Sequence, residues 1–246
     1  MSIAVNSRKI THVALVQWLN DPTQSSCTIY LKQGTPFETL TKPLECRFDI
    51  SILSMLKDIA NSSETGAVLF HKQDKLHLLL PPFPIQIDAI YLKWEPNPLL
   101  AILAQEPWIC VVLLRLGRYA VGIYHGKQLV FSKSGNRYVK GRHHAGGTSQ
   151  ARFARIREGQ VNALFSIVCR LLQNSLDTYR GDLEHLFLGG ERQTLLAFRR
   201  RCPYLASLAS LTRRRNLNIR TPGNQALVDL PSQLWTSQMV TIALPG

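Results

Sequence analysis

The chain has 246 residues, enough for one large domain or two small ones, and its 45% apolar and 18% charged residues exclude a mainly disordered or low-complexity protein. Its 29 Lys and Arg exceed its 16 Asp and Glu, and the resulting charge of +13 at pH 7 indicates a polyanionic partner, nucleic acid before an anionic membrane surface. The longest apolar run, residues 108–114, is too short to span a bilayer and no secretory signal pattern is present, so we expect a cytoplasmic protein with no membrane partner.

Residues 1–100 predict a small mixed α/β domain. In chain order we expect a strand at residues 28–31, a helix at 50–60 and two strands at 67–70 and 76–80 that are joined at Gln73 and Asp74. Pro81 and Pro82 end the last of these strands. Prolines 84, 96 and 98 indicate a linker-like region, and we place a domain boundary near residues 98–106.

Residues 105–246 predict a second domain with a more regular pattern. Apolar strands separated by glycine-containing turns predict an antiparallel meander at residues 109–116, 119–124, 128–131 and 137–140. From Phe153 to Tyr179 the apolar residues then recur at steps of three and four. This period predicts one helix of about eight turns with Thr148 or Ser149 as its N-cap.

The rest of the chain alternates strands and helices. We expect a strand at residues 183–188, a helix at 191–201, a short strand at 217–219, a short helix or turn at 222–229 and a last strand at 239–244. A meander, a long crossover helix and alternating elements are typical of a ribonuclease-H-like domain. The predicted fold is therefore α/β (α+β), with a ribonuclease-H-like domain at residues 105–246 after a smaller N-terminal domain at 1–100.

Basic residues concentrate in two stretches that contain no Asp or Glu. The first, residues 107–157, has ten Lys and Arg, and the second, residues 192–228, has eight Arg. Ordinary solvated surfaces mix both signs of charge, so the first stretch indicates phosphate binding. Two-metal phosphodiester cleavage needs several carboxylates, which makes a metal-dependent nuclease a poor fit. We expect neither a metal nor another cofactor.

Other conspicuous side chains have structural interpretations. The five cysteines are widely spaced with no Cys-x-x-Cys pair, which indicates neither a disulfide framework nor a zinc site, and Cys110 and Cys169 are expected in the core. Glu158 is expected to pair with Arg155 or a basic neighbour. Four aromatic residues alternate within predicted strands and are expected to pack rather than to stack on bases: Tyr119, Tyr124, Phe131 and Tyr138.

The most unusual segment is residues 141–150, in which Gly146 and Gly147 precede the start of the long helix. Glycines allow the backbone to approach a ligand closely, and a helix N-terminus offers free N–H groups. A carboxamide does not titrate near neutral pH, so Gln150 can orient a water and hydrogen-bond a developing oxyanion but cannot be a general base. That chemistry suits hydrolysis of an activated ester such as the one in peptidyl-tRNA. The alternative is a plain surface turn before a capped helix.

Five segments of this region carry a recognisable pattern: residues 116–122 (LGRYAVG), 132–139 (SKSGNRYV), 141–150 (GRHHAGGTSQ), 152–155 (RFAR) and 157–160 (REGQ). Together they resemble the bacterial branch of the Vms-type release-factor-like peptidyl-tRNA hydrolases, relatives of the catalytic middle domain of eukaryotic and archaeal class I release factors. The resemblance is dense over about residues 105–190 and looser elsewhere.

This resemblance implies an ester hydrolase that releases nascent chains from tRNA on stalled or split ribosomes, with peptidyl-tRNA and the large ribosomal subunit as partners. Gln150 takes the place of the catalytic glutamine, and Gly146 and Gly147 take the places of the loop glycines. Release factors have the glutamine directly after the glycine pair, whereas Thr148 and Ser149 intervene here. The residues expected to face RNA are Arg137, Lys140, Arg142, His143, His144, Arg152, Arg155 and Arg157.

Two other functions remain open at this point. One is a metal-independent endonuclease that cuts tRNA near its 3′ end, in which His143 and His144 act as acid and base. The other is a non-catalytic module that binds RNA or the ribosome. The nature of the product separates the three functions, because hydrolysis leaves intact tRNA, cleavage shortens it, and binding alone leaves the substrate unchanged.

Overall fold

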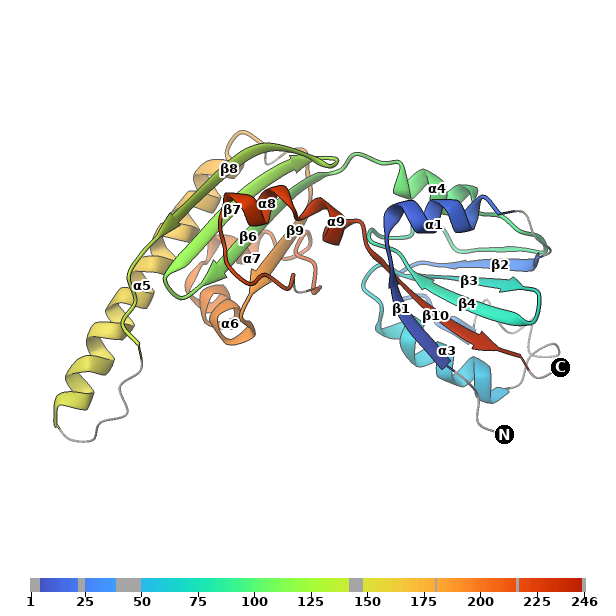
Figure 1. Cartoon of the computed structure of the whole chain (residues 1–246), viewed down its shortest axis with the longest axis horizontal. Coiled ribbons are helices and arrows are strands. Elements are labelled where there is room, and N and C mark those ends of the chain that lie inside the picture. The colour runs from blue at the N-terminus through green and yellow to red at the C-terminus, as the bar shows by residue number, and fades with distance from the viewer. Residues whose placement is uncertain are drawn as a thin grey trace. The chain divides into compact units, whose positions relative to one another are not determined.

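The computed structural model describes residues 5–21, 25–38, 50–141, 148–179, 181–215 and 217–244. The chain divides into two compact units, one made of Met1–Gln105 with Ser232–Gly246 and the other of Glu106–Pro231. Each unit has its own sheet with helices packed on it (Figure 1). The chain thus leaves the first unit within the predicted interval of 98–106 and returns to it at Ser232.

The first unit contains a six-stranded sheet in the order β1-β10-β4-β3-β2-β5, in which all neighbours are antiparallel. Its strands are β1 (Val5–Ile10), β2 (Ser25–Leu31), β3 (Ala67–Lys72), β4 (Lys75–Leu80), β5 (Ala89–Tyr91) and β10 (Ser237–Ala243). Helices α1 (His12–Leu19), α3 (Ile50–Ser62) and α4 (Asn97–Leu103) accompany the sheet. Leu53 and Leu56 of α3 pack on the face formed by Leu69 and Leu78. The four elements predicted before residue 81 are confirmed.

Strand β10 corrects the predicted extent of the second domain. A last strand was expected within residues 105–246, but β10 lies between β1 and β4, where Val240 pairs with Ser7 on one side and with Leu78 on the other. The strand completes the core of the first unit because Val240 and Ile242 are buried there. Local pattern identifies a strand and says nothing of the sheet it joins.

The linker prediction before residue 106 is also wrong. Pro98 lies in the first turn of α4, a position that tolerates proline because the N–H it lacks has no acceptor within the helix. Leu99, Ile102 and Leu103 of α4 are buried, so the segment is part of the folded unit. Strand β1 and helix α1, which the sequence analysis did not predict, likewise belong to it.

The second unit contains a four-stranded sheet in the order β8-β7-β6-β9. Strands β6 (Trp108–Arg115), β7 (Arg118–His125) and β8 (Gln128–Asn136) form an antiparallel meander, and β9 (Leu183–Gly190) runs parallel to β6. Helix α5 (Thr148–Leu176) is the connection between β8 and β9, and its 29 residues make the predicted eight turns. Meander, crossover helix and parallel strand confirm the predicted ribonuclease-H-like arrangement.

Smaller elements complete this unit: α6 (Arg192–Arg201), α7 (Tyr204–Ser207), α8 (Asn224–Val228) and α9 (Pro231–Leu234), the last at the passage to the first unit. The predicted strand at 217–219 is reduced to a single parallel bridge between Leu217 and Gly189. One face of the sheet packs against α5 and α6, whose Phe165 and Phe198 lie 5.5 Å apart between ring centroids. On the other face the Tyr124 hydroxyl donates a hydrogen bond to the Leu227 carbonyl at 2.7 Å.

Strand β8 differs from its prediction. Residues 134–136 were expected to form a turn between two strands, but they continue β8 to Asn136, and residues 137–140 are not a strand. Gly135 pairs with Tyr119 of β7, and a Cβ at Gly135 would overlap the Tyr119 hydroxyl. Gly135 therefore makes room for the Tyr119 ring within the sheet. In the sequence, a glycine with this role cannot be distinguished from a glycine that forms a turn.

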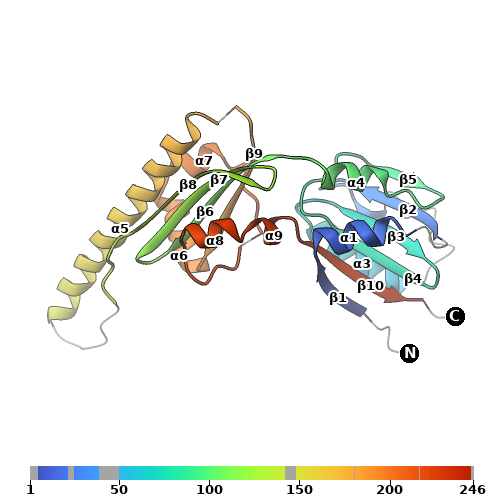
Figure 2. The same cartoon turned by 45° about the horizontal axis from the view of Figure 1, so that its top comes forward.

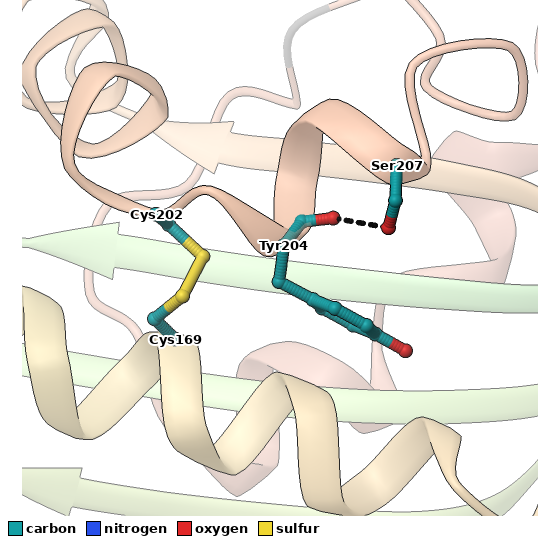
Figure 3. The surroundings of a disulfide bond; sticks show 4 residues. All are labelled: Cys169, Cys202, Tyr204 and Ser207. Atoms are coloured by element: carbon teal, nitrogen blue, oxygen red, sulfur yellow. Dashed lines mark hydrogen bonds between the residues drawn. A yellow bond between two sulfur atoms is a disulfide. The ribbon is translucent and has the colours of Figure 1, made fainter.

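A disulfide links Cys169 of α5 to Cys202 at the end of α6 (Figure 3). The expectation that no disulfide forms is wrong. The two cysteines are 33 residues apart in sequence, which hides the pairing, but the fold brings their Cα atoms to within 5.5 Å of each other. Cys27 and Cys110 are free and buried, as expected for Cys110. The cross-link ties the long helix to α6 on the same face of the sheet.

His185 in β9 is buried, and its Nδ1 accepts hydrogen bonds from Nε and Nη2 of Arg213 at 3.2 and 2.7 Å. Burial, reinforced by the Arg213 charge, lowers the pKa of His185 from 6.5 to about 4. The unfolded chain binds a proton below about pH 6.5 but the folded protein only below about pH 4. The contribution of neutral His185 to the free energy of unfolding is therefore fully present above pH 6.5, and it declines as the pH falls toward 4.

We expect the free energy of unfolding of His185→Gln to depend less on pH than that of the wild type, by about 3 kcal/mol between pH 7 and pH 4. The variant lacks one histidine that takes up a proton on unfolding between pH 4 and 6.5, whereas His77, whose pKa burial also lowers to about 4, is present in both proteins and cancels in the comparison. Urea unfolding of both proteins across this range measures the difference. Parallel pH profiles would contradict the assigned role of His185.

Candidate functional site

Helix α5 carries Gln150 in its first turn, and the Gln150 side chain is exposed. The buried apolar residues of α5 come from its second half: Leu164, Phe165, Val168, Leu172 and Leu176. At 1.5 Å per residue, Gln150 lies roughly 20 Å along the helix from the first of them. Figures 1 and 2 show this end of α5 extending past the strands of its unit. The helix therefore carries Gln150 well beyond the core.

The first turn of α5 also sets the electrostatics around Gln150. Its N–H groups have no acceptors within the helix and, with the helix dipole, favour a negative group. The prediction of Thr148 or Ser149 as N-cap is wrong, because both are already helical, and the capping position lies outside the described residues. Gln150 thus presents its amide beside a positive helix end.

The segment after β8 is fixed to α5 through the Lys140 peptide. The Lys140 N–H donates to Gln160 Oε1 at 2.9 Å, and the Lys140 carbonyl accepts from Arg157 Nε at 3.0 Å. The Lys140 ammonium also lies 4.0 Å from the centroid of the Phe153 ring. These three contacts hold Lys140 against the helix that carries Gln150.

Basic side chains surround this end of α5. Arg152 and Arg155 on the helix and Arg137 before it are exposed, and within the described ranges none of the three is ion-paired to a carboxylate. Glu158, the first acid after the basic stretch, pairs with Arg201 of α6 at 3.1 Å rather than with Arg155 as predicted. The positive charges near Gln150 are therefore available to an anionic ligand.

Gln150 lines a surface cavity of about 450 Å³ between α5 and α6. Phe153, Val161 and Phe165 supply apolar walls, and the Glu158–Arg201 ion pair contributes polar groups. No three His, Cys, Asp or Glu side chains gather as a metal site in the part of the chain that the structure describes. Among the described helices, none is long and apolar enough to cross a membrane.

The structure describes six of the predicted site residues, all in the second unit: Gln150, Arg137, Lys140, Arg152, Arg155 and Arg157. Lys140 contacts Arg157, and Gln150 and Arg157 line one cavity, whereas Arg137 is hydrogen-bonded to Gly117 of the β6–β7 hairpin. The other five lie outside the described residues: Arg142, His143, His144, Gly146 and Gly147. Two contacts were not predicted, namely Gln160 with Lys140 and Glu158 with Arg201. No periodic pattern marks such residues, because their partners are 20 and 43 positions away.

Two solved structures resemble this chain at low sequence identity. An archaeal translation termination factor, aRF1, matches with a TM-score of 0.40 and 17% identity over 91% of this chain and 71% of that one. The Vms1 mitochondrial localization core matches with a TM-score of 0.42 and 12% identity over 90% of this chain and 92% of that one.

The sequence comparisons identify a curated relative and a family for this chain. The chain is 24% identical over 154 residues to peptide chain release factor subunit 1 of Archaeoglobus fulgidus, covering 58% of this chain and 38% of that protein. The chain thus spans well under half the length of this curated relative. Residues 107–240 match the profile of a family described as Actinobacteria/chloroflexi VLRF1 release factor. Because this match extends over more than half of the chain, the protein belongs to the VLRF1 family of Vms-type release-factor-like proteins.

Proposed function

We propose that this protein hydrolyses the ester bond of peptidyl-tRNA and releases nascent chains from stalled or split ribosomes. The observation that carries the proposal is the position of Gln150, exposed in the first turn of a helix that extends it roughly 20 Å beyond the core. A group on such a projection can enter a narrow cavity that the body of the protein cannot. Membership of the VLRF1 release-factor family supports the same reaction.

The chemistry follows from the amide. Its oxygen accepts a hydrogen bond from the attacking water, and its N–H groups donate to the oxyanion that develops on the ester carbonyl. Because a carboxamide cannot take the proton of the water, the adjacent ribose 2′ hydroxyl of the tRNA would accept it while passing its own proton to the departing 3′ oxygen. The positive end of α5 adds a favourable field for the developing negative charge.

The basic residues give the protein its affinity for RNA. Arg152 and Arg155 are exposed on the same half of α5 as Gln150, Arg137 is exposed before the helix, and all three would contact phosphates of the tRNA or of the large ribosomal subunit. The five predicted site residues between Arg142 and Gly147 remain part of the proposal. Ribosomes and peptidyl-tRNA meet in the cytoplasm, so the proposal includes that compartment.

The direct test is single-turnover release of a labelled peptide from peptidyl-tRNA, on and off the large ribosomal subunit. The tRNA product is sized to one nucleotide. Intact tRNA with a free 3′ hydroxyl supports ester hydrolysis. Shortened tRNA would replace the proposal by a phosphodiester cleavage, and unchanged substrate together with tight RNA binding would replace it by a binding module.

The Gln160–Lys140 hydrogen bond supplies a second prediction. We expect Gln160→Ala to slow peptide release about tenfold, because the segment leading to Gln150 loses an anchor worth about one hydrogen bond. Gln160→Glu keeps the acceptor oxygen and should release at close to the wild-type rate. Equal rates for all three proteins would show that this anchor does not position the segment.

A further inference from the structure

The hairpin between β6 and β7 places two arginines directly opposite each other. Arg115 and Arg118 are Cα partners at the end of the ladder, and both are exposed. Like charges at opposed positions destabilise a strand pair. In the described ranges neither arginine is ion-paired to a carboxylate. The hairpin therefore keeps an electrostatic cost that a bound anion would remove.

A cavity of about 630 Å³ opens beside this pair and is formed by three segments of the second unit. The first is the hairpin itself, and the second follows β8 and contributes Asn136 and Tyr138. The third is the stretch 220–222, which adds Arg220 and Thr221. The volume lies in the range of sites that bind small molecules or single nucleotides.

The walls of the cavity are held in place by the fold. The Arg137 N–H donates to the Gly117 carbonyl at 2.9 Å, which joins the first segment to the second. Asn136 is the Cα partner of Arg118 across β7 and β8. The third segment is fixed by Ile219 and Pro222, which are buried. The polar side chains therefore extend from a rigid frame.

Tyr138 is the unusual member of this set, because 73% of its surface is exposed although it was expected to pack as part of a strand. An exposed aromatic ring beside three guanidinium groups offers both elements of single-stranded RNA recognition. The ring stacks on a base, and each guanidinium presents paired N–H groups to a phosphate. Asn136 and Thr221 supply hydrogen-bond donors and acceptors for a base edge or a ribose hydroxyl.

We propose that this cavity binds an unpaired nucleotide of RNA, with its base on Tyr138 and the flanking phosphates on Arg115, Arg118 and Arg220. The inference rests on the proposed function for the identity of the polymer, since peptidyl-tRNA and ribosomal RNA are the anions that such an enzyme meets. It adds a binding site outside the 141–150 segment. The residues that line this cavity have no assigned role in the ester hydrolysis.

The test measures binding of a fluorescently labelled, unstructured RNA oligonucleotide by anisotropy at several salt concentrations. We expect Tyr138→Ala to weaken binding about fivefold or more without changing the salt dependence, and Tyr138→Phe to retain the affinity. Arg115→Gln should weaken binding and reduce the slope of log K against log[salt] by about 0.7. Arg192→Gln removes an equal charge from an exposed position on α6 and serves as the matched control.

Wild-type affinity in Tyr138→Ala, or equal losses in Arg115→Gln and Arg192→Gln, would overturn the inference. Competition by polyglutamate as strong as by unlabelled RNA would assign the cavity to acidic peptides instead and would also overturn it. Binding needs no hydrolysis, so the two proposals fail separately. Protein that binds RNA through Tyr138 but releases no peptide refutes only the proposed function, and protein that releases peptide but binds equally well without Tyr138 refutes only this inference.

Discussion

Gln150→Ala should abolish peptide release, with a fall in the single-turnover rate of at least about 100-fold, while the affinity for RNA stays close to that of the wild type. The loss is expected to be this large because the amide is proposed to contact the attacking water and the oxyanion, whose charges change most in the transition state. RNA affinity should be retained because the proposed phosphate contacts come from other side chains, Arg137, Arg152 and Arg155 among them.

Two further variants make this experiment specific. Gln150→Glu keeps the length of the side chain but removes its N–H donors, and we expect it to be strongly impaired as well. Gln173→Ala removes an exposed glutamine from the other end of α5 and should release peptide at the wild-type rate. A normal rate in Gln150→Ala, with the substrate bound at saturation, would show that the amide has no part in the chemistry.

The second unit was the easier one to predict, because its pattern is local. The apolar residues of β6 run without interruption from Trp108 to Leu114, Gly117 marks the turn to β7, and the three- and four-residue period of α5 persists to Leu176. Such periods depend on backbone geometry alone, so the meander and the crossover helix could be expected before any tertiary contact was known. Gln150 was chosen as a candidate from two glycines before a helix start and from the resemblance to the release-factor-like family, and its role remains a proposal.

The features that could not be predicted depend on contacts between residues distant in sequence. Position 135 of β8 is a glycine because a Cβ there would overlap the Tyr119 ring. Cys169 forms a disulfide with Cys202 because α5 and α6 pack on one face of the sheet. Strand β10 joins the first sheet after 126 residues of the second unit, Glu106–Pro231. Pattern analysis has no access to such pairings, which are decided by the packing of the whole unit.

The cavity beside Arg115 could not be predicted either, because the residues that form it are distant in sequence. Each of its arginines was counted in a basic stretch, but the sequence separates Arg118 from Arg220 by about a hundred residues. Tyr138 was expected to pack because it was assigned to a strand that does not form. The end of β8 at Asn136 leaves the ring exposed and next to the arginines, so the site arises from an irregularity that the strand pattern concealed.

Gly190→Ala should destabilise the second unit by more than about 3 kcal/mol. Gly190 ends β9 with φ of 135°, a conformation that L side chains rarely adopt, and a Cβ there would overlap the Leu114 carbonyl oxygen of β6. The clash involves two backbones and cannot be relieved by rotating a side chain. Helix α5 leads directly into β9, and β9 is held in the sheet by its parallel pairing with β6, so loss of this pairing removes support from the helix that carries Gln150.

Gly159→Ala is the matched control, since Gly159 lies inside α5 and a Cβ there meets no atom within 4 Å. Alanine in a helix interior loses less backbone entropy on folding than glycine, so this variant should be more stable than the wild type by about 0.5–1 kcal/mol. Urea unfolding, with hydrogen exchange of the β6 amides as the signal for the second unit, measures both changes. If Gly190→Ala unfolds at the same urea concentration as the wild type, β9 ends in a different conformation and the close approach of Gly190 to Leu114 is wrong.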